Sequence, residues 1–353
     1  MRSSAVTLTL VLVAVACDRV PEARPDTSPP TPPAKAPAAP AVASAAPATG
    51  SYRLPATDRV IAIGDLHGDL SALRATLRLA GAIDTDDRWI GKQLTVVQTG
   101  DQVDRGDQDR EVLDVIEKLE NDAKAADSHF YVLNGNHELM NAGFDFRYVT
   151  RKSFARFGDY SRQATGAAEH LPDDQRGRAA AFSPGGPYAL KLSKHLTLAL
   201  VGDSLFAHAG VLPAHVDYGL DRINRESQDF LSGRSRSSSP ALSAEDSPIW
   251  TRFYGGSVDE TTCQVLGRVL QQVGAKRLVV GHTVQAAGIN GACDNRLFRI
   301  DVGLSAFFGE NPRQVLEITP AGAKVLKAGA GATTPAEPPR KSQPRDSALH
   351  SPP

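Results

Sequence analysis

Apolar residues in the first half of the chain follow two spacings in turn, one typical of strands and one typical of helices. Residues 59–64, 93–99 and 129–133 are short apolar runs, and each ends at or within two residues of a glycine. Between them, residues 70–80 and 110–126 repeat apolar residues every three or four positions, which is the spacing of one helix face. This order predicts a βαβαβ start with parallel strands and right-handed crossovers.

The second half shows a different pattern, in which short apolar runs follow one another with few helical stretches between them. The predicted strands are residues 196–201, 205–208, 277–281, 297–302 and 315–318. Mixed sheets packed face to face, with helices outside, fit this pattern better than one open parallel sheet. We therefore predict an α/β fold built on a two-sheet mixed sandwich flanked by helices. Residues 172–186 and 232–247 are rich in charged, Gly, Pro or Ser residues and are interpreted as surface insertions.

The N-terminus has the pattern of an export signal. One arginine precedes an apolar run over residues 5–16, which is too short to span a bilayer and ends at Cys17. Residues 12–17 resemble a bacterial lipobox, whose cysteine becomes the lipidated first residue of the mature chain. We expect an exported protein, periplasmic or in the cell envelope, that reaches a membrane through this lipid anchor. An ordinary cleaved signal with an incidental cysteine is the alternative.

Composition divides the chain into four parts. Residues 1–17 form the signal with its lipobox-like end, and residues 18–56 are rich in Pro and Ala, with almost no large apolar residues. Such a segment cannot bury enough surface to offset its ordering entropy, so we expect a disordered tether. Residues 57–327 form the predicted folded domain. Residues 328–353 are Gly, Ala, Thr, Pro and charged residues, and are predicted to be a disordered tail.

Charge and cysteine content exclude several classes of protein. The net charge is −1, which argues against nucleic acid or an anionic membrane face as an electrostatic partner. Three cysteines, at 17, 263 and 293, are too few and too far apart for a zinc knuckle. In an oxidising compartment Cys263 and Cys293 would be free to pair, whereas the alternative is two buried thiols; the sequence leaves both open.

Metal-ligating side chains follow the predicted strands at positions next to glycine or another small residue. They are Asp65, His67, Asp101, Asn136, His208 and His282. Each alone is explained by a turn or by a structural histidine, but their order at successive strand ends predicts one shared site. One aspartate can bridge two cations roughly 3.5–4 Å apart. Mixed nitrogen and oxygen ligands suit Mn²⁺, Fe or Zn²⁺ rather than a soft metal.

The motifs around these residues resemble those of the calcineurin-like metallophosphoesterases. The motifs are Gly-Asp-Leu-His-Gly at 64–68, Gly-Asp-Gln-Val-Asp-Arg-Gly at 100–106, Gly-Asn-His-Glu at 135–138, His-Ala-Gly at 208–210 and Gly-His at 281–282. The second and third are similar to the phosphoprotein-phosphatase branch. Residues 147–149, 249–252, 279–285 and 299–303 further resemble the Shewanella-like (bacterial-like) protein phosphatases. The resemblance covers residues 60–305 and implies a calcineurin-like fold.

The resemblance also implies a role for each motif residue. One divalent ion would be held by Asp65, His67 and Asp101, and the other by Asp101, Asn136, His208 and His282, with Asp101 bridging. His137 would protonate the leaving oxygen while bonded to Asp104. Arg105 and Arg252 would clamp the phosphoryl oxygens. With two such ions, Mn²⁺ foremost, a metal-bridging hydroxide would attack phosphorus directly, without a phosphoenzyme.

The predicted function is therefore that of a metal-dependent phosphomonoester hydrolase, a protein phosphatase for phosphotyrosine or phosphoserine and phosphothreonine. The expected partners are a phosphorylated protein or a small phosphoester, and the expected state is a monomer. A dinucleoside-polyphosphate hydrolase shares these motifs, but an exported location argues against it. A catalytically inactive envelope scaffold would lack a ligand, and the sequence keeps every one. Asn134 stands where eukaryotic enzymes typically carry Arg, so eukaryotic substrate preferences do not transfer directly.

Overall fold

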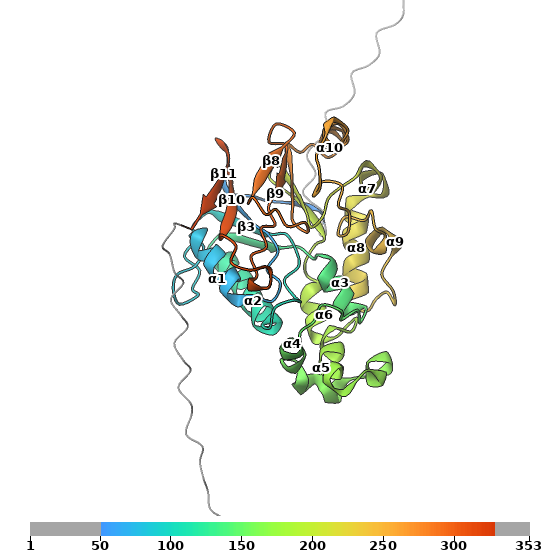
Figure 1. The fold of residues 1–353 in the computed structure, drawn as a ribbon. Helices are drawn as coiled ribbons and strands as arrows, with labels where there is room; N and C mark the ends of the chain where they lie inside the picture. The colour runs from blue at the N-terminus through green and yellow to red at the C-terminus, as the bar shows by residue number, and fades with distance from the viewer. Residues whose placement is uncertain (1–50, 329–353) are drawn as a thin grey trace, which may run out of the picture. The chain divides into compact units, whose positions relative to one another are not determined.

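The computed structural model describes residues 51–328, and the strands in this part form two mixed sheets (Figure 1). The five-stranded sheet has the order β11-β10-β2-β3-β4, with β2 at Arg59–Ile63, β3 at Leu94–Gln98, β4 at His129–Val132, β10 at Gln314–Thr319 and β11 at Gly322–Lys327. The six-stranded sheet has the order β1-β5-β6-β7-β9-β8, with β1 at Arg53–Leu54, β5 at Leu198–Val201, β6 at Ser204–Ala207, β7 at Arg277–Val280, β8 at Asn290–Ala292 and β9 at Leu297–Arg299.

The predicted βαβαβ start is present in the five-stranded sheet. Strands β2, β3 and β4 are parallel neighbours, joined by helix α1 at Leu70–Leu79 and helix α2 at Asp109–Ala125. Helix α1 begins where the Asp69 carboxylate accepts a hydrogen bond of 2.8 Å from the amide of Ala72, which satisfies a donor that the first turn leaves free. The β-branched runs that predicted these strands are buried because the sheet is covered on both faces.

Side-chain alternation along the six-stranded sheet divides the core into two parts. In β5, Ala199 and Val201 pack in the cluster that fills the space between the two sheets. Leu198 and Leu200 point to the opposite face and pack among helices. Neighbouring side chains of a strand point to opposite faces, so one short apolar strand serves both halves of the core.

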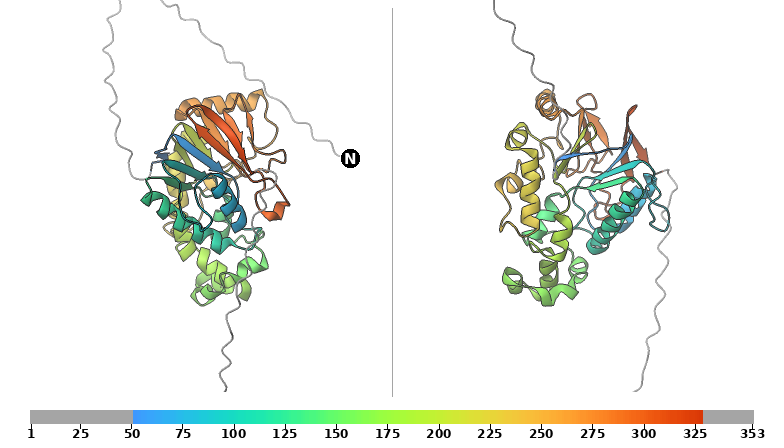
Figure 2. Two further views of the ribbon diagram at one scale, coloured as in Figure 1. Left: turned by 90° about the vertical axis from the view of Figure 1, so that its left-hand side faces the viewer. Right: turned by 180° about the vertical axis from the view of Figure 1, so that it is seen from behind.

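Helices cover the outer faces of both sheets, as Figure 2 shows. The remaining α-helices are α3 at Asn136–Ala142, α4 at Arg151–Ala155, α5 at Asp173–Phe182, α6 at Pro187–Leu192, α7 at Pro213–Tyr218, α8 at Leu220–Leu231, α9 at Pro240–Ser243 and α10 at Glu260–Val273. Short 3₁₀ helices are η1 at Gly158–Gln163, η2 at Gly166–His170 and η3 at Ala306–Phe308. The expectation of few helices among the later strands is wrong, since α7 to α10 all lie between β6 and β7.

The interpretation of residues 172–186 as a surface insertion is also wrong. Helix α5 lies in this stretch, and its residues from Gly177 to Phe182 are buried. The helix was not predicted because its first half is charged, Arg178 interrupts the apolar residues of its second half, and Pro-Gly-Gly follows it. Residues 232–247 do lie largely at the surface, with Leu242 buried beneath them.

Cys263 and Cys293 form a disulfide, with their Cα atoms 5.3 Å apart. Cys263 lies on α10, and Cys293 lies in the turn between β8 and β9. The bond therefore ties a helix that covers the six-stranded sheet to a hairpin at the edge of that sheet. Of the two possibilities that the sequence left open, the structure has the disulfide.

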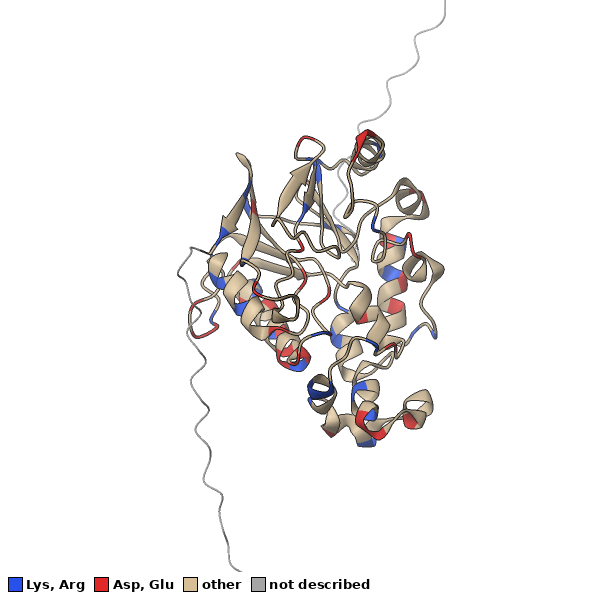
Figure 3. Cartoon of the chain, in the orientation of Figure 1, with Lys and Arg blue, Asp and Glu red and all other residues tan. Residues whose placement is uncertain are grey.

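Several predictions concern residues outside the described part of the chain. The export signal and lipobox at 1–17, residues 18–50 of the tether and residues 329–353 of the tail all lie there. Within residues 51–328, no helix combines the length and the apolar character needed to cross a membrane. Basic and acidic residues are mixed along α2 and α5 (Figure 3), in keeping with the near-zero net charge.

Candidate metal centre and active site

The loops that follow β2 and β3 are joined by backbone hydrogen bonds. Ile63 lies opposite Gln98 in the parallel ladder, so both loops leave the same edge of the sheet. The amides of Leu66 and His67 donate to the carbonyl oxygen of Asp101 at 3.0 and 2.9 Å. His67 and Asp101 have positive φ angles of 45° and 56°, a region that residues with a side chain rarely adopt. Such conformations persist where the surrounding structure enforces them, often at functional sites.

Two motif glycines allow main chain to approach the carboxylates. A Cβ atom added to Gly135 would collide with Asp101 Oδ1, and one added to Gly281 would collide with Asp65 Oδ1. The Gly135 backbone is extended, with φ of −96°, so close approach and not an unusual φ is what requires glycine there. These two glycines leave room for both aspartates beside the main chain.

Two histidines are oriented by backbone carbonyl oxygens. His208 Nδ1 lies 3.0 Å from the carbonyl oxygen of Thr99, and His67 Nδ1 lies 3.1 Å from that of Val103. A carbonyl oxygen only accepts, so each Nδ1 carries the hydrogen and donates it. Each Nε2 then presents a lone pair toward Asp101 Oδ2, at 3.2 Å from His208 and 3.8 Å from His67.

Two further candidate metal ligands, Asn136 and His282, lie beside His208. Its Nε2 is 3.0 Å from Asn136 Oδ1 and 3.0 Å from His282 Nδ1. With the hydrogen of His208 on Nδ1, Nε2 and the Asn136 oxygen are both acceptors at this distance, and a cation between them would relieve their repulsion. His282 also has a positive φ, 65°, and its backbone amide donates to the Asp65 carboxylate at 3.1 Å.

The protonation behaviour of this cluster fits divalent cations. Burial lowers the pKa of His67 to about 3, and burial together with the neighbouring His208 lowers that of His282 to about 3, so both rings are neutral and able to ligate. Burial, together with the carboxylates of Asp301 and Asp101, raises the pKa of Asp65 well above its usual value. Crowded buried carboxylates with neutral imidazoles form a site whose missing positive charge metal ions would supply.

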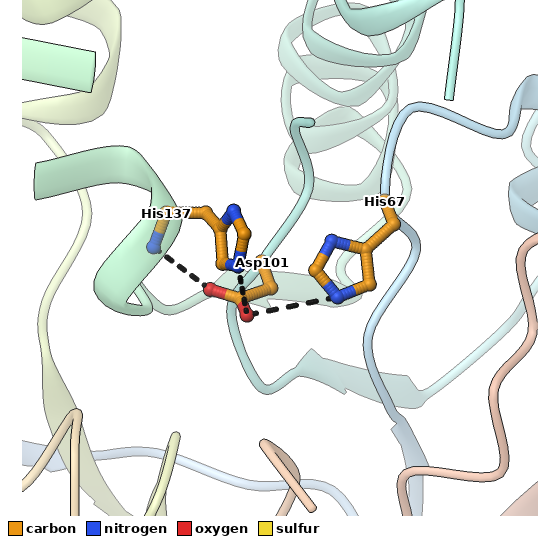
Figure 4. A group of neighbouring side chains, drawn as sticks. All are labelled: His67, Asp101 and His137. Carbon is orange, nitrogen blue, oxygen red and sulfur yellow. Dashed lines mark hydrogen bonds and ion pairs between the residues drawn. The ribbon is translucent and has the colours of Figure 1, made fainter. Parts of the chain in front are cut away.

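Asp101 belongs to both groups of side chains that are able to hold a metal ion. One group is His67, Asp101 and His137, and the other is Asp101, His208 and His282. Figure 4 shows His67 and His137 on either side of the Asp101 carboxylate, whose Oδ1 accepts a hydrogen bond of 3.1 Å from the backbone amide of His137. A shared carboxylate at the centre of two ligand groups is the arrangement that a two-metal site needs.

His137 and Asp104 form a buried pair at the edge of this cluster. His137 Nδ1 lies 2.7 Å from Asp104 Oδ2, and neither side chain is more than 2% exposed. Burial opposes protonation of His137, but the carboxylates of Asp101 and Asp104 outweigh it and raise its pKa. Asp104 fixes the hydrogen on Nδ1, which leaves Nε2 facing the cavity, 3.8 Å from Asp101 Oδ2.

Comparison with known proteins agrees with this geometry. Residues 58–286 match the calcineurin-like phosphoesterase family. The chain is 37% identical to Shewanella-like protein phosphatase 2 of Arabidopsis thaliana, over 75% of this chain and 76% of the relative. It is 29% identical to Shewanella-like protein phosphatase 1 of Plasmodium berghei, over 70% and 68%. The chain belongs to the calcineurin-like phosphoesterases.

Solved structures show the same fold. The phosphoesterase resembles a cold-active protein-tyrosine phosphatase of a psychrophilic Shewanella species, with a TM-score of 0.64 at 24% identity over 78% of this chain and 82% of that one. A serine/threonine phosphatase from Saccharomyces cerevisiae gives a TM-score of 0.53 at 16% identity, over 79% and 84%. The predicted two-sheet fold and family are therefore confirmed, and the chain is a metal-dependent phosphoester hydrolase.

The phosphoesterase has a cavity of about 160 Å³ over this cluster. It is lined by His67, Asp101, Arg105, Asn136, His137, Tyr148, Trp250, Arg252, His282, Val284, Asp301 and Phe308. Arg105 and Arg252, the two predicted phosphate ligands, thus face the same space as the metal ligands. Arg252 is exposed at the rim, where its Nη1 donates to Thr283 Oγ1 at 3.1 Å. The structure brings all ten predicted site residues to this one region.

Aromatic rings enclose Arg105, and no motif role was predicted for them from the sequence. Its guanidinium carbon lies 5.0, 5.5 and 5.1 Å from the ring centres of Tyr148, Phe307 and Phe308. These distances are those of cation–π contacts. Phe307 and Phe308 follow the Arg-Ile-Asp-Val-Gly motif within a few residues, which is the one local signal that pointed to them.

Two buried acids of the phosphoesterase were also left without a role. Glu138 accepts hydrogen bonds from the amides of Asp101 at 2.9 Å, Gln102 at 2.8 Å and Gly135 at 2.7 Å, and burial raises its pKa to about 7. It holds the Asp101 loop against the start of α3. Asp301 lines the cavity with 1% exposure, and burial raises its pKa to about 6. Both stand inside the recognised motifs, but their buried positions depend on distant loops.

Proposed function

We propose that this phosphoesterase is a protein phosphatase that favours phosphotyrosine over phosphoserine and phosphothreonine. The observation that carries the proposal is the aromatic surround of Arg105 at the metal-ligand cavity. A guanidinium takes phosphoryl oxygens in a fork, and rings of Tyr148, Phe307 and Phe308 beside it offer apolar faces to a phenol ring. The similarity to a structure described as a protein tyrosine phosphatase, at 25% identity and a TM-score of 0.63, supports this preference.

The residues present would hold two divalent cations, with Mn²⁺ as the proposed metal. Asp65, His67 and Asp101 would bind one, and Asp101, Asn136, His208 and His282 would bind the other. When bound, such ions supply a water of lowered pKa and neutralise charge on the phosphoryl oxygens. Nitrogen and oxygen donors without a thiolate favour Mn²⁺, Fe or Zn²⁺.

The chain's own residues account for the other half of the reaction. Arg105 and Arg252 hold the phosphoryl oxygens in the cavity that Asp101 also lines. The doubly protonated His137 ring gives its Nε2 proton to the phenol oxygen as the phosphorus–oxygen bond breaks. Water supplies the oxygen of the released phosphate, and the proton that this water loses returns the ring to its starting state. Asp104 keeps the His137 ring oriented through Nδ1. Water is the nucleophile, so no phosphoenzyme forms.

The test is hydrolysis of three matched phosphopeptides by the full-length protein. The enzyme is stripped with a chelator, reloaded with Mn²⁺, Fe²⁺ or Zn²⁺, and assayed on peptides that differ only in phosphotyrosine, phosphoserine or phosphothreonine. We expect activity to return with metal, highest on phosphotyrosine, and to be absent in Asp101→Asn. Equal rates on all three peptides would remove the tyrosine preference, and cleavage of diadenosine tetraphosphate alone would replace a protein phosphatase with a dinucleoside-polyphosphate hydrolase.

We further infer that the enzyme acts outside the cytoplasm, attached to a membrane through Cys17. The lipobox-like residues 12–17 support this placement, and so does the Cys263–Cys293 disulfide, because disulfides persist in oxidising compartments. Labelling cells with a tagged fatty acid tests it. The wild-type protein should carry the label and sediment with membranes, and Cys17→Ser should do neither. An unlabelled wild-type protein in the cytosol would contradict the inference.

A further inference from the structure

A buried ion cluster lies directly behind the His137–Asp104 pair. It consists of Arg178 on α5 and the carboxylates of Asp104 and Asp109, and none of the three side chains is exposed to solvent. Arg178 Nη2 lies 2.9 Å from Asp104 Oδ1 and 2.7 Å from Asp109 Oδ2. Removing such charges from water is expensive, and a buried ion network is weak evidence of a purely stabilising role.

Nearly every hydrogen-bonding group of Arg178 is used. Its Nε donates to Asn141 Oδ1 at 2.7 Å, and its Nη1 donates to Ser153 Oγ at 2.8 Å. Its guanidinium carbon lies 5.2 and 4.8 Å from the ring centres of Phe157 and Phe182. A planar fork held at this many points has one position, and a lysine, with its single point charge, would not reproduce the contacts.

The Asp104 carboxylate is divided between two neighbours. Oδ1 accepts from Arg178 and, at 2.9 Å, from Asn141 Nδ2, while Oδ2 faces His137 Nδ1 at 2.7 Å. With Oδ1 occupied, the carboxylate is unable to rotate, and only Oδ2 is left for the histidine. The orientation of the ring, and of Nε2 in the cavity, therefore depends on what holds Oδ1.

The same cluster supports the turn that carries Arg105. Asp104 and Arg105 have positive φ angles of 71° and 66°, and the amide of Asp104 donates to Asp109 Oδ1 at 3.1 Å. Asp109 Oδ2 in turn accepts from Ser153 Oγ at 2.7 Å and lies against Arg178. Arg178 thus reaches the Asp104–Arg105 turn by two routes, through the Asp104 side chain and through Asp109.

We propose that Arg178 is a positioning residue of the reaction, which aims the general acid His137 by fixing Asp104 from a helix outside the two sheets. The proposal rests on the proposed function, in which His137 protonates the leaving oxygen. Arg178 touches neither the substrate nor a metal ligand, so its substitution should disturb proton donation and leave metal binding intact. Arg178 lies 74 positions after Asp104 in the sequence, in the helical segment that contains α5, so the orientation of His137 would depend on a residue outside the motif loops.

Leaving-group dependence separates this role from a structural one. A substrate whose leaving oxygen needs no proton, 2,4-dinitrophenyl phosphate, bypasses the general acid, whereas phenyl phosphate and phosphotyrosine depend on it. In the full-length enzyme we expect Arg178→Met to lower kcat on phenyl phosphate by about 10- to 100-fold, a part of what general acid catalysis contributes. On 2,4-dinitrophenyl phosphate kcat should change less than about threefold, and bound metal per chain should equal that of the wild type.

Arg110 provides a matched control. It lies 6.0 Å from the ring centre of Phe157, on which Arg178 also packs, and it pairs with Asp159 at 2.7 Å without contacting Asp104. Arg110→Met should keep the wild-type ratio of the two kcat values. If Arg178→Met does not fold, Arg178→Lys, which keeps a positive charge in the cluster, should fold and show the same selective loss at a smaller size.

Two results would overturn the proposal. One is an equal loss on both substrates in a folded variant with full metal content. The other is a further selective loss when Arg178→Lys is added to His137→Ala, because the acid would already be absent. Failure of the proposed function is distinguishable from either, since the wild-type enzyme would then release no phosphate from any phosphopeptide or aryl phosphate in any metal.

Discussion

In the proposed reaction the metal-ligand loops would hold the divalent ions and the α5 region would orient the proton donor, and these two regions are built differently. Each ligand loop follows directly after a buried strand and contains one short motif. Its residues are therefore positioned by their neighbours in the sequence and by hydrogen bonds to the adjoining loop. The α5 region reaches the His137–Asp104 pair through a single arginine, Arg178, which contacts Asp104 from 74 residues away. The strand ends position the candidate metal ligands directly. The helical segment acts at one remove, because Arg178 positions Asp104 and Asp104 positions His137.

This difference explains which parts the sequence reveals. A ligand loop has to carry its chemistry in a few adjacent residues, so it produces a motif. A supporting arginine has to satisfy only the shape and charge of its buried surroundings, so it leaves no local pattern. Perturbing the two regions should therefore give different outcomes, with loss of metal from one and loss of proton transfer from the other.

The largest effect is expected at Asp101, the residue that both ligand groups share. Asp101→Asn keeps the shape but removes a bridging charge, so kcat should fall by about 10³-fold or more, beyond the 10- to 100-fold typical of residues that only support a ligand. Metal analysis of the purified variant should find less than the wild-type content. Full metal content with full activity in this variant would contradict the role of Asp101 as a shared metal ligand.

His137→Ala is expected to rank second. It removes the proposed proton donor but no predicted metal ligand, so kcat on phosphotyrosine should fall by about 10²-fold or more while metal content stays the same. The measurement is steady-state kinetics beside metal analysis on the same preparation. If the variant loses metal along with activity, then His137 ligates a metal, which its place in the group with His67 and Asp101 would allow.

Acid should weaken metal binding. The pKa of Asp65 is raised in the metal-free protein, chiefly by burial and then by Asp301 and Asp101, so this carboxyl is still protonated at pH values where an ordinary aspartate is ionised. Metal binding requires the ionised form and must release the proton. Affinity should therefore rise with pH, by about tenfold per unit for one proton released, until Asp65 is ionised in the free protein. Isothermal titration in buffers of different ionisation enthalpy measures that release; a buffer-independent enthalpy would contradict it.

The smallest effect is expected at the aromatic surround of Arg105. Phe307 is 61% exposed, so Phe307→Ala should fold normally and remove only a face beside the substrate ring. We expect KM for a phosphotyrosine peptide to rise by about 2- to 10-fold, the size of one aromatic contact, with kcat nearly unchanged. The matched phosphoserine peptide serves as the control, and an equal rise there would show that Phe307 supports Arg105 and not the phenol ring.

The parts of this molecule that depend on residues close together in the sequence could be predicted. The βαβαβ start followed from apolar spacing, and the clustering of the candidate ligands from Asp65 to His282 followed from their places after strands. Helix α5 did not, because Asp173, Asp174, Arg176 and Arg178 interrupt any apolar stripe and residues 184–186 read as a turn. The buried position of Arg178 on this helix depends on Asp104, Asp109 and Phe157, which all lie outside α5. A charged residue whose partners are distant in the sequence is predicted to lie at the surface, because its partners cannot be identified until the fold is known.

Glycines 135 and 281 give the motif pattern a second meaning. The Asp and His residues of the motifs supply the atoms that would hold a metal. The glycines instead leave space, since even a methyl side chain at either position would collide with an aspartate oxygen. The positions of the two carboxylates are thus limited by main chain, and not by neighbouring side chains that are free to repack. For protein engineers this means that substitutions around the candidate metal site will not shift these carboxylates. A change of metal preference has to come from substitution of the ligand residues themselves.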